Sequence, residues 1–166
     1  LARDFFGIKP VYYAEIDGHF VFASEIKSIL AFPGYERKVN QKALEQYLSF
    51  QYAPLEETFF KGIYKLMPGH MLLYKNGNYE IKTYFKTKLT PDKWNRKTNM
   101  DQLRSQLAEI LKDSVKHHML SDVEVGAFLS GGVDSGYLAS ASGADQAFTV
   151  GFDEGDRYSE VNKAAK

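Results

Sequence analysis

Two adjacent glycines, Gly131 and Gly132, stand between an apolar segment and a helix-forming segment, and this junction constrains the fold more than any other feature of the chain. The preceding segment, 123–129, ends in an uninterrupted apolar run, which predicts a strand covered on both faces. A helix is expected over about 135–142, and residues 147–152 predict a second strand. Strand, helix and strand in this order predict a βαβ unit with parallel strands.

The loop between this strand and this helix has the chemistry of an anion cradle. Adjacent glycines let the backbone turn sharply and direct successive N–H groups at one point. The N-terminal end of the following helix adds partial positive charge, and serine hydroxyls on both sides of the glycines can donate hydrogen bonds. The loop consists of Ser130, Gly131, Gly132, Val133, Asp134 and Ser135. It differs from the common P-loop because no Gly-Lys-Ser/Thr sequence follows the glycines, so we interpret it as a phosphate site of another kind.

Asp134 gives the loop a negative charge, which opposes phosphate binding unless a cation shares the site. Mg²⁺ that bridges the Asp134 carboxylate and phosphate oxygens is the natural candidate. The alternative is a Gly-Gly turn capped by Ser and Asp side chains with no ligand, which any α/β protein can contain. The local residues alone leave these two interpretations open.

The first half of the chain predicts two β-hairpins. They span residues 11–23 and 71–85, with turns at Asp17-Gly18 and Asn76-Gly77. Both dipeptides favour the positive backbone φ angles that tight hairpin turns require.

Two short helices are expected between the hairpins. The first covers residues 25–31, with Ser24 as its N-cap. The second begins after Asn40 as its N-cap and has an apolar face that is expected to be buried. The residues of that face are Leu44, Tyr47 and Leu48.

A change of pattern divides the chain into two modules. The polar stretch 86–98 is rich in Lys and Thr and is interpreted as a linker. A long amphipathic helix with Asn99 as its N-cap follows. We therefore expect an α+β module over residues 1–85 and an α/β module over residues 99–166. Both ends of the chain lack ordinary start or stop signals, so we expect it to be a piece of a longer protein.

Composition excludes several classes of site and partner. Lys plus Arg and Asp plus Glu both number 21, so the formal net charge is zero and gives no electrostatic reason to expect nucleic acid or an anionic membrane as partner. The absence of cysteine excludes disulfides, thiolate metal sites and a cysteine nucleophile within these residues. No apolar run approaches the length of a membrane span. We expect a globular, cytoplasmic protein.

The Ser-Gly-Gly-Val-Asp-Ser loop after an apolar strand resembles the pyrophosphate loop of the ATP pyrophosphatases, which split ATP between its α and β phosphates. Its flanks, 122–129 and 148–152, resemble those of the glutamine-dependent asparagine synthetase family. Three segments of the first half resemble the later half of that family's glutaminase domain, in the same order. They are 3–13, 22–27 and 66–70. The resemblance covers nearly the whole chain.

The resemblance implies a fold and a reaction. Residues 1–85 would form the later half of an N-terminal-nucleophile-type glutaminase domain, and residues 99–166 the first βαβ unit of an ATP-pyrophosphatase domain. The complete protein would use ATP and Mg²⁺ to adenylate aspartate and amidate it with ammonia from glutamine. No nucleic acid or membrane partner is implied, and a homodimer stays open. The residues implied in binding ATP or pyrophosphate are Phe128, Ser130, Gly131, Gly132, Val133, Asp134, Ser135 and Val150, with Asp134 also implied in binding Mg²⁺.

The chain departs from the family pattern in three ways. These residues lack the family's N-terminal cysteine nucleophile, so no catalytic residue is assigned. Gly136 stands where the family usually has serine, which removes a hydroxyl but keeps the backbone N–H. The family's acceptor residues lie further along than residue 166. Two alternatives therefore remain: a related amidotransferase that acts on a sugar, antibiotic or peptide carboxylate, and a truncated, non-catalytic scaffold module.

The motifs of the first half are interpreted as scaffold rather than as catalytic groups. Arg3 and Asp4 are expected to form a structural ion pair, and Gly7 and Pro10 to shape a turn before a strand. Pro68-Gly69 is likewise expected to be a turn.

Overall fold

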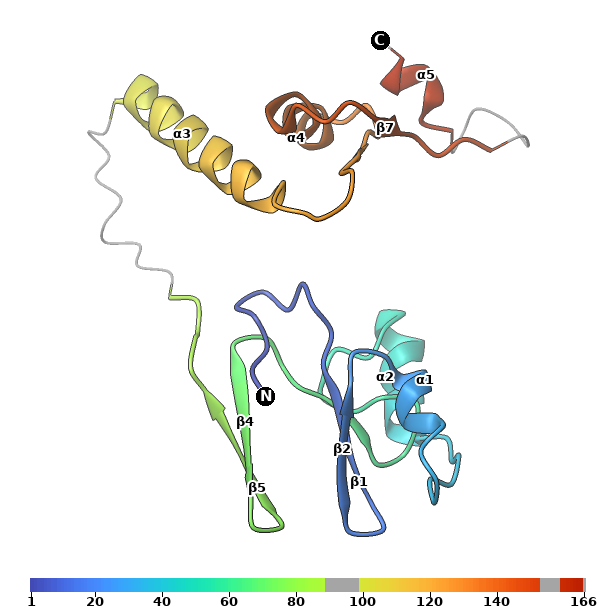
Figure 1. Cartoon of the computed structure of the whole chain (residues 1–166). Coiled ribbons are helices and arrows are strands. Elements are labelled where there is room, and N and C mark those ends of the chain that lie inside the picture. The colour runs from blue at the N-terminus through green and yellow to red at the C-terminus, as the bar shows by residue number, and fades with distance from the viewer. Residues whose placement is uncertain (89–98, 153–158, 166) are drawn as a thin grey trace. The chain divides into compact units, whose positions relative to one another are not determined.

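The computed structural model describes residues 1–88, 99–152 and 159–165, and the chain divides into two compact units, Leu1–Leu89 and Thr90–Lys166 (Figure 1). Each unit is described by itself. Most of the expected linker, 89–98, lies outside the described residues.

The first unit contains a three-stranded antiparallel sheet with the order β2-β1-β3. Its strands are β1 (Tyr12–Ile16), β2 (His19–Ala23) and β3 (Ile63–Lys65). Asp17 (φ 46°) and Gly18 (φ 76°) form the turn between β1 and β2, and Ile16 pairs with His19. Positive φ at both central residues is the geometry of a type I′ turn, so the first expected hairpin is confirmed.

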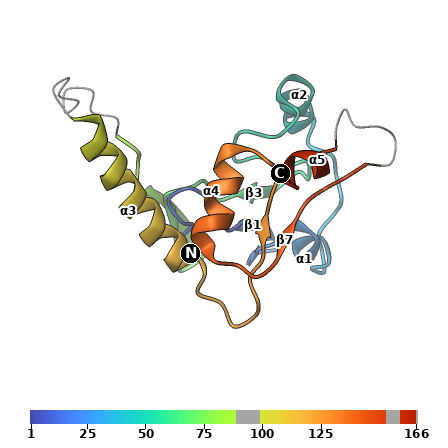
Figure 2. The same cartoon turned by 90° about the horizontal axis from the view of Figure 1, so that it is seen from above.

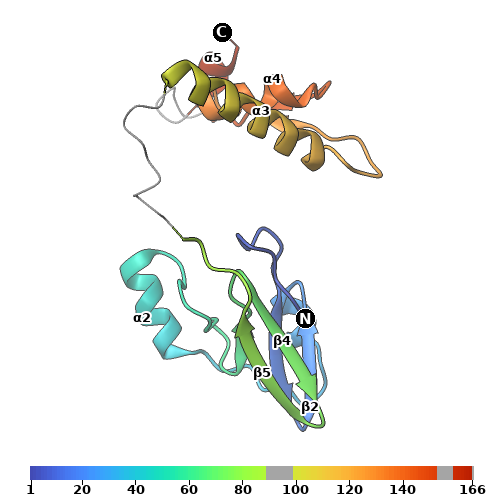
Figure 3. The ribbon, with the colours of Figure 1, turned by 90° about the vertical axis from the view of Figure 1, so that its left-hand side faces the viewer.

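A second hairpin, of β4 (His70–Lys75) and β5 (Asn78–Thr83), lies beside this sheet (Figure 3). Its turn residues Asn76 (φ 51°) and Gly77 (φ 78°) also confirm the prediction. The strand ends at Thr83 rather than at residue 85 because the next two backbone N–H groups both turn to the carbonyl of Gly69.

Aromatic and aliphatic side chains join the two antiparallel layers. Tyr13, Leu66 and Leu72 form one buried cluster, and the rings of Phe20 and Tyr74 stack with centroids 4.6 Å apart. A second cluster of Ala14, Ile16, Ile29 and Ile63 lies beneath α1 (Ile26–Leu30), whose Ile29 is fully buried. Burial of these apolar surfaces is the main stabilising contribution to this unit.

The start of α1 differs from the prediction. The N-cap is Glu25, which is extended (φ −130°, ψ 138°) and makes no capping hydrogen bond through its side chain. Ser24 therefore lies one residue too early to accept a hydrogen bond from the first turn, and the expectation that it caps the helix was wrong.

The buried face of α2 (Gln41–Phe50) also differs from the prediction. Asn40 is the N-cap, without a capping bond from its side chain, and Ala43 is the buried residue. Leu44 and Tyr47 are exposed, and Leu48 is 76% exposed. The expected apolar face was wrong because α2 turns the small Ala43 side chain toward the rest of the unit. Tyr47 stays exposed, although its ring forms a T-shaped pair with that of Phe59.

Arg3 and Asp4 bind backbone groups and form no ion pair with each other among the described residues. The Arg3 guanidinium donates hydrogen bonds to three carbonyl oxygens, at distances of 2.7 to 2.9 Å. They belong to Gly7, Lys9 and Leu66. The Asp4 carboxylate accepts hydrogen bonds from the N–H groups of Phe6, Ile8 and Lys9. The expected ion pair was wrong because each group instead satisfies the turn at Gly7, whose φ of +70° leaves its neighbours without regular backbone partners.

The second unit is built around two helices, α3 (Met100–His118) and α4 (Val133–Ser142), and a short α5 (Val161–Ala164) (Figure 2). The Asn99 side chain accepts a hydrogen bond from the Asp101 N–H at 2.9 Å, which confirms the expected N-cap of α3. None of the described helices is both long and apolar enough to cross a bilayer.

The parallel strands of the second unit are β6 (Ala127–Phe128) and β7 (Ala147–Phe148), joined through α4. Their parallel pairing confirms the βαβ arrangement. The expected strands, 123–129 and 147–152, were too long because among the described residues β6 and β7 pair only with each other. The expectation of two covered faces was also wrong for the described part of the chain, where Phe128 is 82% exposed.

We predict that Asp4→Asn in the full-length protein accelerates amide hydrogen exchange at Ile8 and Lys9 at neutral pH, because an amide replaces the charged acceptor of their N–H groups. Hydrogen bonds from Lys9 and Ile8 hold the pKa of Asp4 below its ordinary value of 3.8. A carboxyl whose pKa is lower in the folded state stabilises that state above its ordinary pKa, and this contribution is lost as the pH falls through the lowered pKa.

The protection factors of Ile8 and Lys9 in the unsubstituted protein should therefore fall toward those of Asp4→Asn at acidic pH. Asp122→Asn, an exposed carboxylate in the second unit, is the matched control. Equal protection in the variant and the unsubstituted protein at pH 7 would contradict this role of Asp4.

Candidate functional site

The loop 130–135 leaves the C-terminal end of β6 and enters α4. Ligands of α/β sheets bind outside the carboxyl ends of parallel strands, where loops and helix N-termini converge. The structure therefore brings the six predicted loop residues to the edge of the β6–β7 pair where a ligand is expected.

Two serine hydroxyls close the loop. The Ser135 Oγ accepts a hydrogen bond from the Ser130 N–H at 3.2 Å and donates one to the Gly132 carbonyl at 3.2 Å. The hydroxyls of Ser130 and Ser135 also lie 2.9 Å apart. These bonds hold the two ends of the loop together around the glycines, so the loop's own hydrogen bonds define its backbone geometry.

The two glycines serve different purposes. Gly131 has a φ of +72°, a conformation that side chains disfavour. A Cβ at Gly131 would also lie only 2.5 Å from the Cβ of Lys163 on α5. Gly132 is the extended N-cap of α4, and a Cβ there would meet only the hydroxyls of Ser130 and Ser135, at 3.4 and 3.8 Å. The close approach of α5 therefore requires glycine at position 131, whereas the space around position 132 permits other residues.

Val133 and Asp134 form the first turn of α4 and are exposed. The Asp134 carboxylate suits the positive end of the helix dipole. No cluster of three or more His, Cys, Asp or Glu side chains that could hold a metal occurs in the part of the chain that the structure describes. A lone exposed carboxylate fits Mg²⁺ nevertheless, because Mg²⁺ commonly binds through one carboxylate, water and the phosphates of a nucleotide.

Phe128 is the last residue of β6, and Val150 lies two residues beyond the end of β7. The Leu129 N–H, just after Phe128, donates to the Phe148 carbonyl at 2.8 Å, and Val150 follows two residues after Phe148. Phe128 is 82% and Val150 54% exposed, so both line an open edge.

Sequence reasoning missed Thr149, whose hydroxyl donates to the Leu129 carbonyl at 2.7 Å. This bond joins the end of β7 to the residue that precedes the loop. A hydroxyl residue directly after an apolar strand was the available signal, but its partner lies 20 residues away in the chain.

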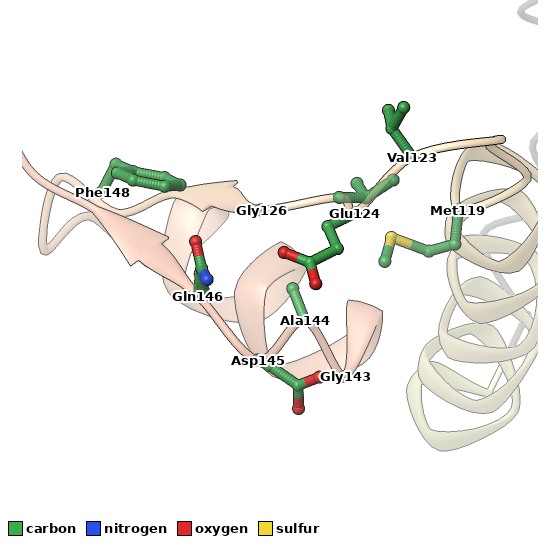
Figure 4. Close-up of a pocket in the computed structure, with 10 residues that line it drawn as sticks. Met119, Val123, Glu124, Gly126, Gly143, Ala144, Asp145, Gln146 and Phe148 are labelled. Carbon is green, nitrogen blue, oxygen red and sulfur yellow. The ribbon is translucent and has the colours of Figure 1, made fainter.

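The described part of the second unit contains hollows both beside the loop and away from it. One has a volume of about 420 Å³ and lies at the opposite, N-terminal end of the strands, where Glu124 and Gln146 precede β6 and β7 (Figure 4). The other is an apolar groove of about 520 Å³ between α3 and α4, bordered by Val133 and Asp134. Only the second adjoins the loop.

The chain resembles known proteins in both units. Residues 1–85 match the family model described as glutamine amidotransferase domain, and residues 106–166 match the one described as asparagine synthase. Asparagine synthetase [glutamine-hydrolyzing] 1 of Bacillus subtilis is 39% identical over 168 residues, which cover 98% of this chain and 26% of that protein. The putative asparagine synthetase [glutamine-hydrolyzing] of Mycobacterium bovis is 35% identical over 178 residues, with coverage of 98% and 26%.

Another relative carries a different name. Amidase chyE of Penicillium rubens is 35% identical over 143 residues, which cover 83% of this chain and 20% of that protein. The chain thus spans about a quarter of the length of the curated relatives that it matches.

We predict that Gly131→Ala in the full-length protein loosens α5, since alanine at positive φ costs about 1–2 kcal/mol and its Cβ would meet Lys163. The measurement is amide hydrogen exchange at Ala164 and Ala165, whose N–H groups bond to Glu160 and Val161. Gly132→Ala is the matched control and should leave these amides protected. Equal exchange in the two variants would show that α5 does not depend on the space at Gly131.

Proposed function

The chain belongs to the glutamine-hydrolysing asparagine synthetase family, with a glutamine amidotransferase match over residues 1–85 and an asparagine synthase match over 106–166, and on this premise we propose that the full-length protein forms asparagine from aspartate, glutamine and ATP. The reaction is an adenylation followed by an amidation. The aspartate β-carboxylate attacks the α-phosphorus of ATP and pyrophosphate leaves; ammonia from glutamine then displaces AMP.

The observation that carries this proposal is the serine-closed loop at the carboxyl edge of β6 and β7. The loop backbone and the hydroxyls of Ser130 and Ser135 would hold the pyrophosphate part of ATP. Preorganised N–H and O–H donors stabilise negative charge that develops on a leaving group, and they cost no reorganisation during the reaction. The chemistry needs positioned donors and cations more than a covalent nucleophile.

Asp134 is the proposed protein ligand of Mg²⁺. Its carboxylate lies in the first turn of α4, next to the donors that would hold phosphate. When bound, Mg²⁺ would neutralise phosphate charge and orient the leaving pyrophosphate. The carboxylate thereby becomes compatible with a polyphosphate ligand that it would otherwise repel.

The backbone around Phe128 and Val150 is proposed to face the adenine. Phe128 ends β6 just before the loop, and Val150 lies two residues beyond β7; both are exposed. Main-chain N–H and C=O groups at strand ends can recognise the edge of a base, while exposed apolar side chains such as that of Phe128 cover its face.

The finer fold assignment is also proposed. The antiparallel first unit fits the later part of an N-terminal-nucleophile-type glutaminase domain over residues 1–85, and the βαβ unit fits the start of an ATP-pyrophosphatase domain over residues 99–166, with 86–98 as linker. These 166 residues contain no cysteine, and glutamine hydrolysis is assigned to none of them. We propose a cytoplasmic location, in keeping with small-molecule substrates.

A second candidate is a related amidotransferase that acts on another carboxylate. The similarity to a relative named as an amidase supports this second candidate. The loop would serve both reactions equally, because adenylation of any carboxylate releases the same pyrophosphate.

Acceptor dependence distinguishes the two candidates. The full-length protein, incubated with ATP, MgCl₂ and ammonium chloride, should release AMP and pyrophosphate only when aspartate is added. Glutamate is the matched control acceptor, since it carries the same groups on a longer side chain. Release of AMP with other carboxylates and none with aspartate would favour the second candidate.

We predict that Asp134→Asn abolishes ATP–pyrophosphate exchange in the full-length protein and leaves the fold intact, because the neutral amide is a poor ligand for Mg²⁺. The measurement is isotope exchange at saturating Mg²⁺, with circular dichroism as the check on folding. Asp145→Asn, at the other end of α4, is the matched control and should exchange normally. Near-normal exchange by Asp134→Asn would show that Asp134 only complements the helix dipole in the first turn of α4.

A further inference from the structure

The short helix α5 lies against the loop 130–135. A Cβ at Gly131 would lie 2.5 Å from the Cβ and 2.7 Å from the carbonyl carbon of Lys163. A Cβ at Gly151 would likewise lie 2.8 Å from a methyl group of Val161. Two glycines, one in the loop and one after β7, therefore provide the space in which α5 packs.

One backbone hydrogen bond attaches the start of α5 to the segment after β7, and the others close the helix itself. The Glu160 N–H donates to the Val150 carbonyl at 3.4 Å, and Ala164 and Ala165 close the turn of the helix onto Glu160 and Val161. Because this bond attaches Glu160 to the chain just after β7, the Cβ of Lys163 lies next to Gly131 of the loop.

The loop lacks a cation of its own. Its only charged side chain is the carboxylate of Asp134, whereas a bound triphosphate carries several negative charges. The described residues of the second unit contain four Lys or Arg side chains. They are Arg104, Lys112, Lys116 and Lys163.

Lys163 is the member of this set whose Cβ lies against the loop backbone at Gly131. Arg104 borders the groove beside Val133 and Asp134 but is paired with Asp101 at 3.3 Å, and Lys112 and Lys116 line a separate hollow between α3 and the end of α4. No ion pair engages Lys163 within residues 99–152 and 159–165. A lysine ammonium on its flexible four-carbon stem is a compact charge that suits phosphate oxygens.

We propose that Lys163 is a phosphate-binding residue of the 130–135 loop, and that α5 delivers to this loop the ammonium that P-loops carry within their own sequence. The inference rests on the proposed function, since it assigns Lys163 to the polyphosphate of the same nucleotide. It adds a residue that lies 28 positions beyond Ser135 and outside the loop motif.

The test is the affinity of the full-length protein for ATP and for pyrophosphate in the presence of MgCl₂, measured by calorimetric titration. Lys163→Ala and Lys163→Met should each weaken both affinities by about tenfold or more, because a charge-assisted hydrogen bond is lost. Lys163→Arg should retain most of the affinity. Lys112→Ala removes the same charge from an exposed site on α3 and should bind as the unsubstituted protein does.

The outcomes separate this inference from the proposed function. If the unsubstituted protein binds ATP and pyrophosphate and Lys163→Met binds them equally well, Lys163 only packs against Gly131 and the inference is wrong. If Lys112→Ala weakens binding as much as Lys163→Ala does, the effect is one of net charge and the inference is also wrong. If the unsubstituted protein binds neither compound, the proposed function itself fails.

Discussion

The candidate site depends on the register in which the parallel strands β6 and β7 pair. The Leu129 N–H bonds to the Phe148 carbonyl, and the Thr149 hydroxyl bonds back to the Leu129 carbonyl, so both strands end at the same level. The loop then begins at Ser130 with its direction fixed, and the serine bonds close it onto the start of α4. If this register slipped by one residue, the loop N–H groups and the strand ends would no longer face one space.

In the first unit, side chains rather than paired strands fix the position of a turn. Its N-terminal turn is held by charged side chains that bind backbone groups: Arg3 bonds to three carbonyl oxygens and Asp4 to three N–H groups. One of these bonds, from Arg3 to the Leu66 carbonyl, spans 63 positions of the chain. Charge-assisted bonds of this kind are stronger than neutral ones, and they tie the turn to the segment that leads into β4.

The two units differ in how completely they bury apolar surface. The first contains two clusters of buried side chains, with Ile29, Ile63 and Leu66 almost inaccessible to solvent. In the described part of the second unit only Val115 is a buried hydrophobic residue, and large apolar side chains such as Phe128 and Phe148 are exposed around the loop. Local hydrogen bonds rather than a core therefore define the geometry of the loop in these residues.

The sequence by itself determined the features whose causes are local. The turns at Asp17-Gly18 and Asn76-Gly77 follow from residues that tolerate positive φ, the Asn99 cap follows from its position before an amphipathic helix, and the βαβ order follows from the alternation of segments. Only the tertiary structure decided which side of α2 is buried, which carbonyls Arg3 binds, and that α5 packs against Gly131. Each of these depends on residues far apart in the chain, and the pattern of one segment carries no information about the surface that will meet it.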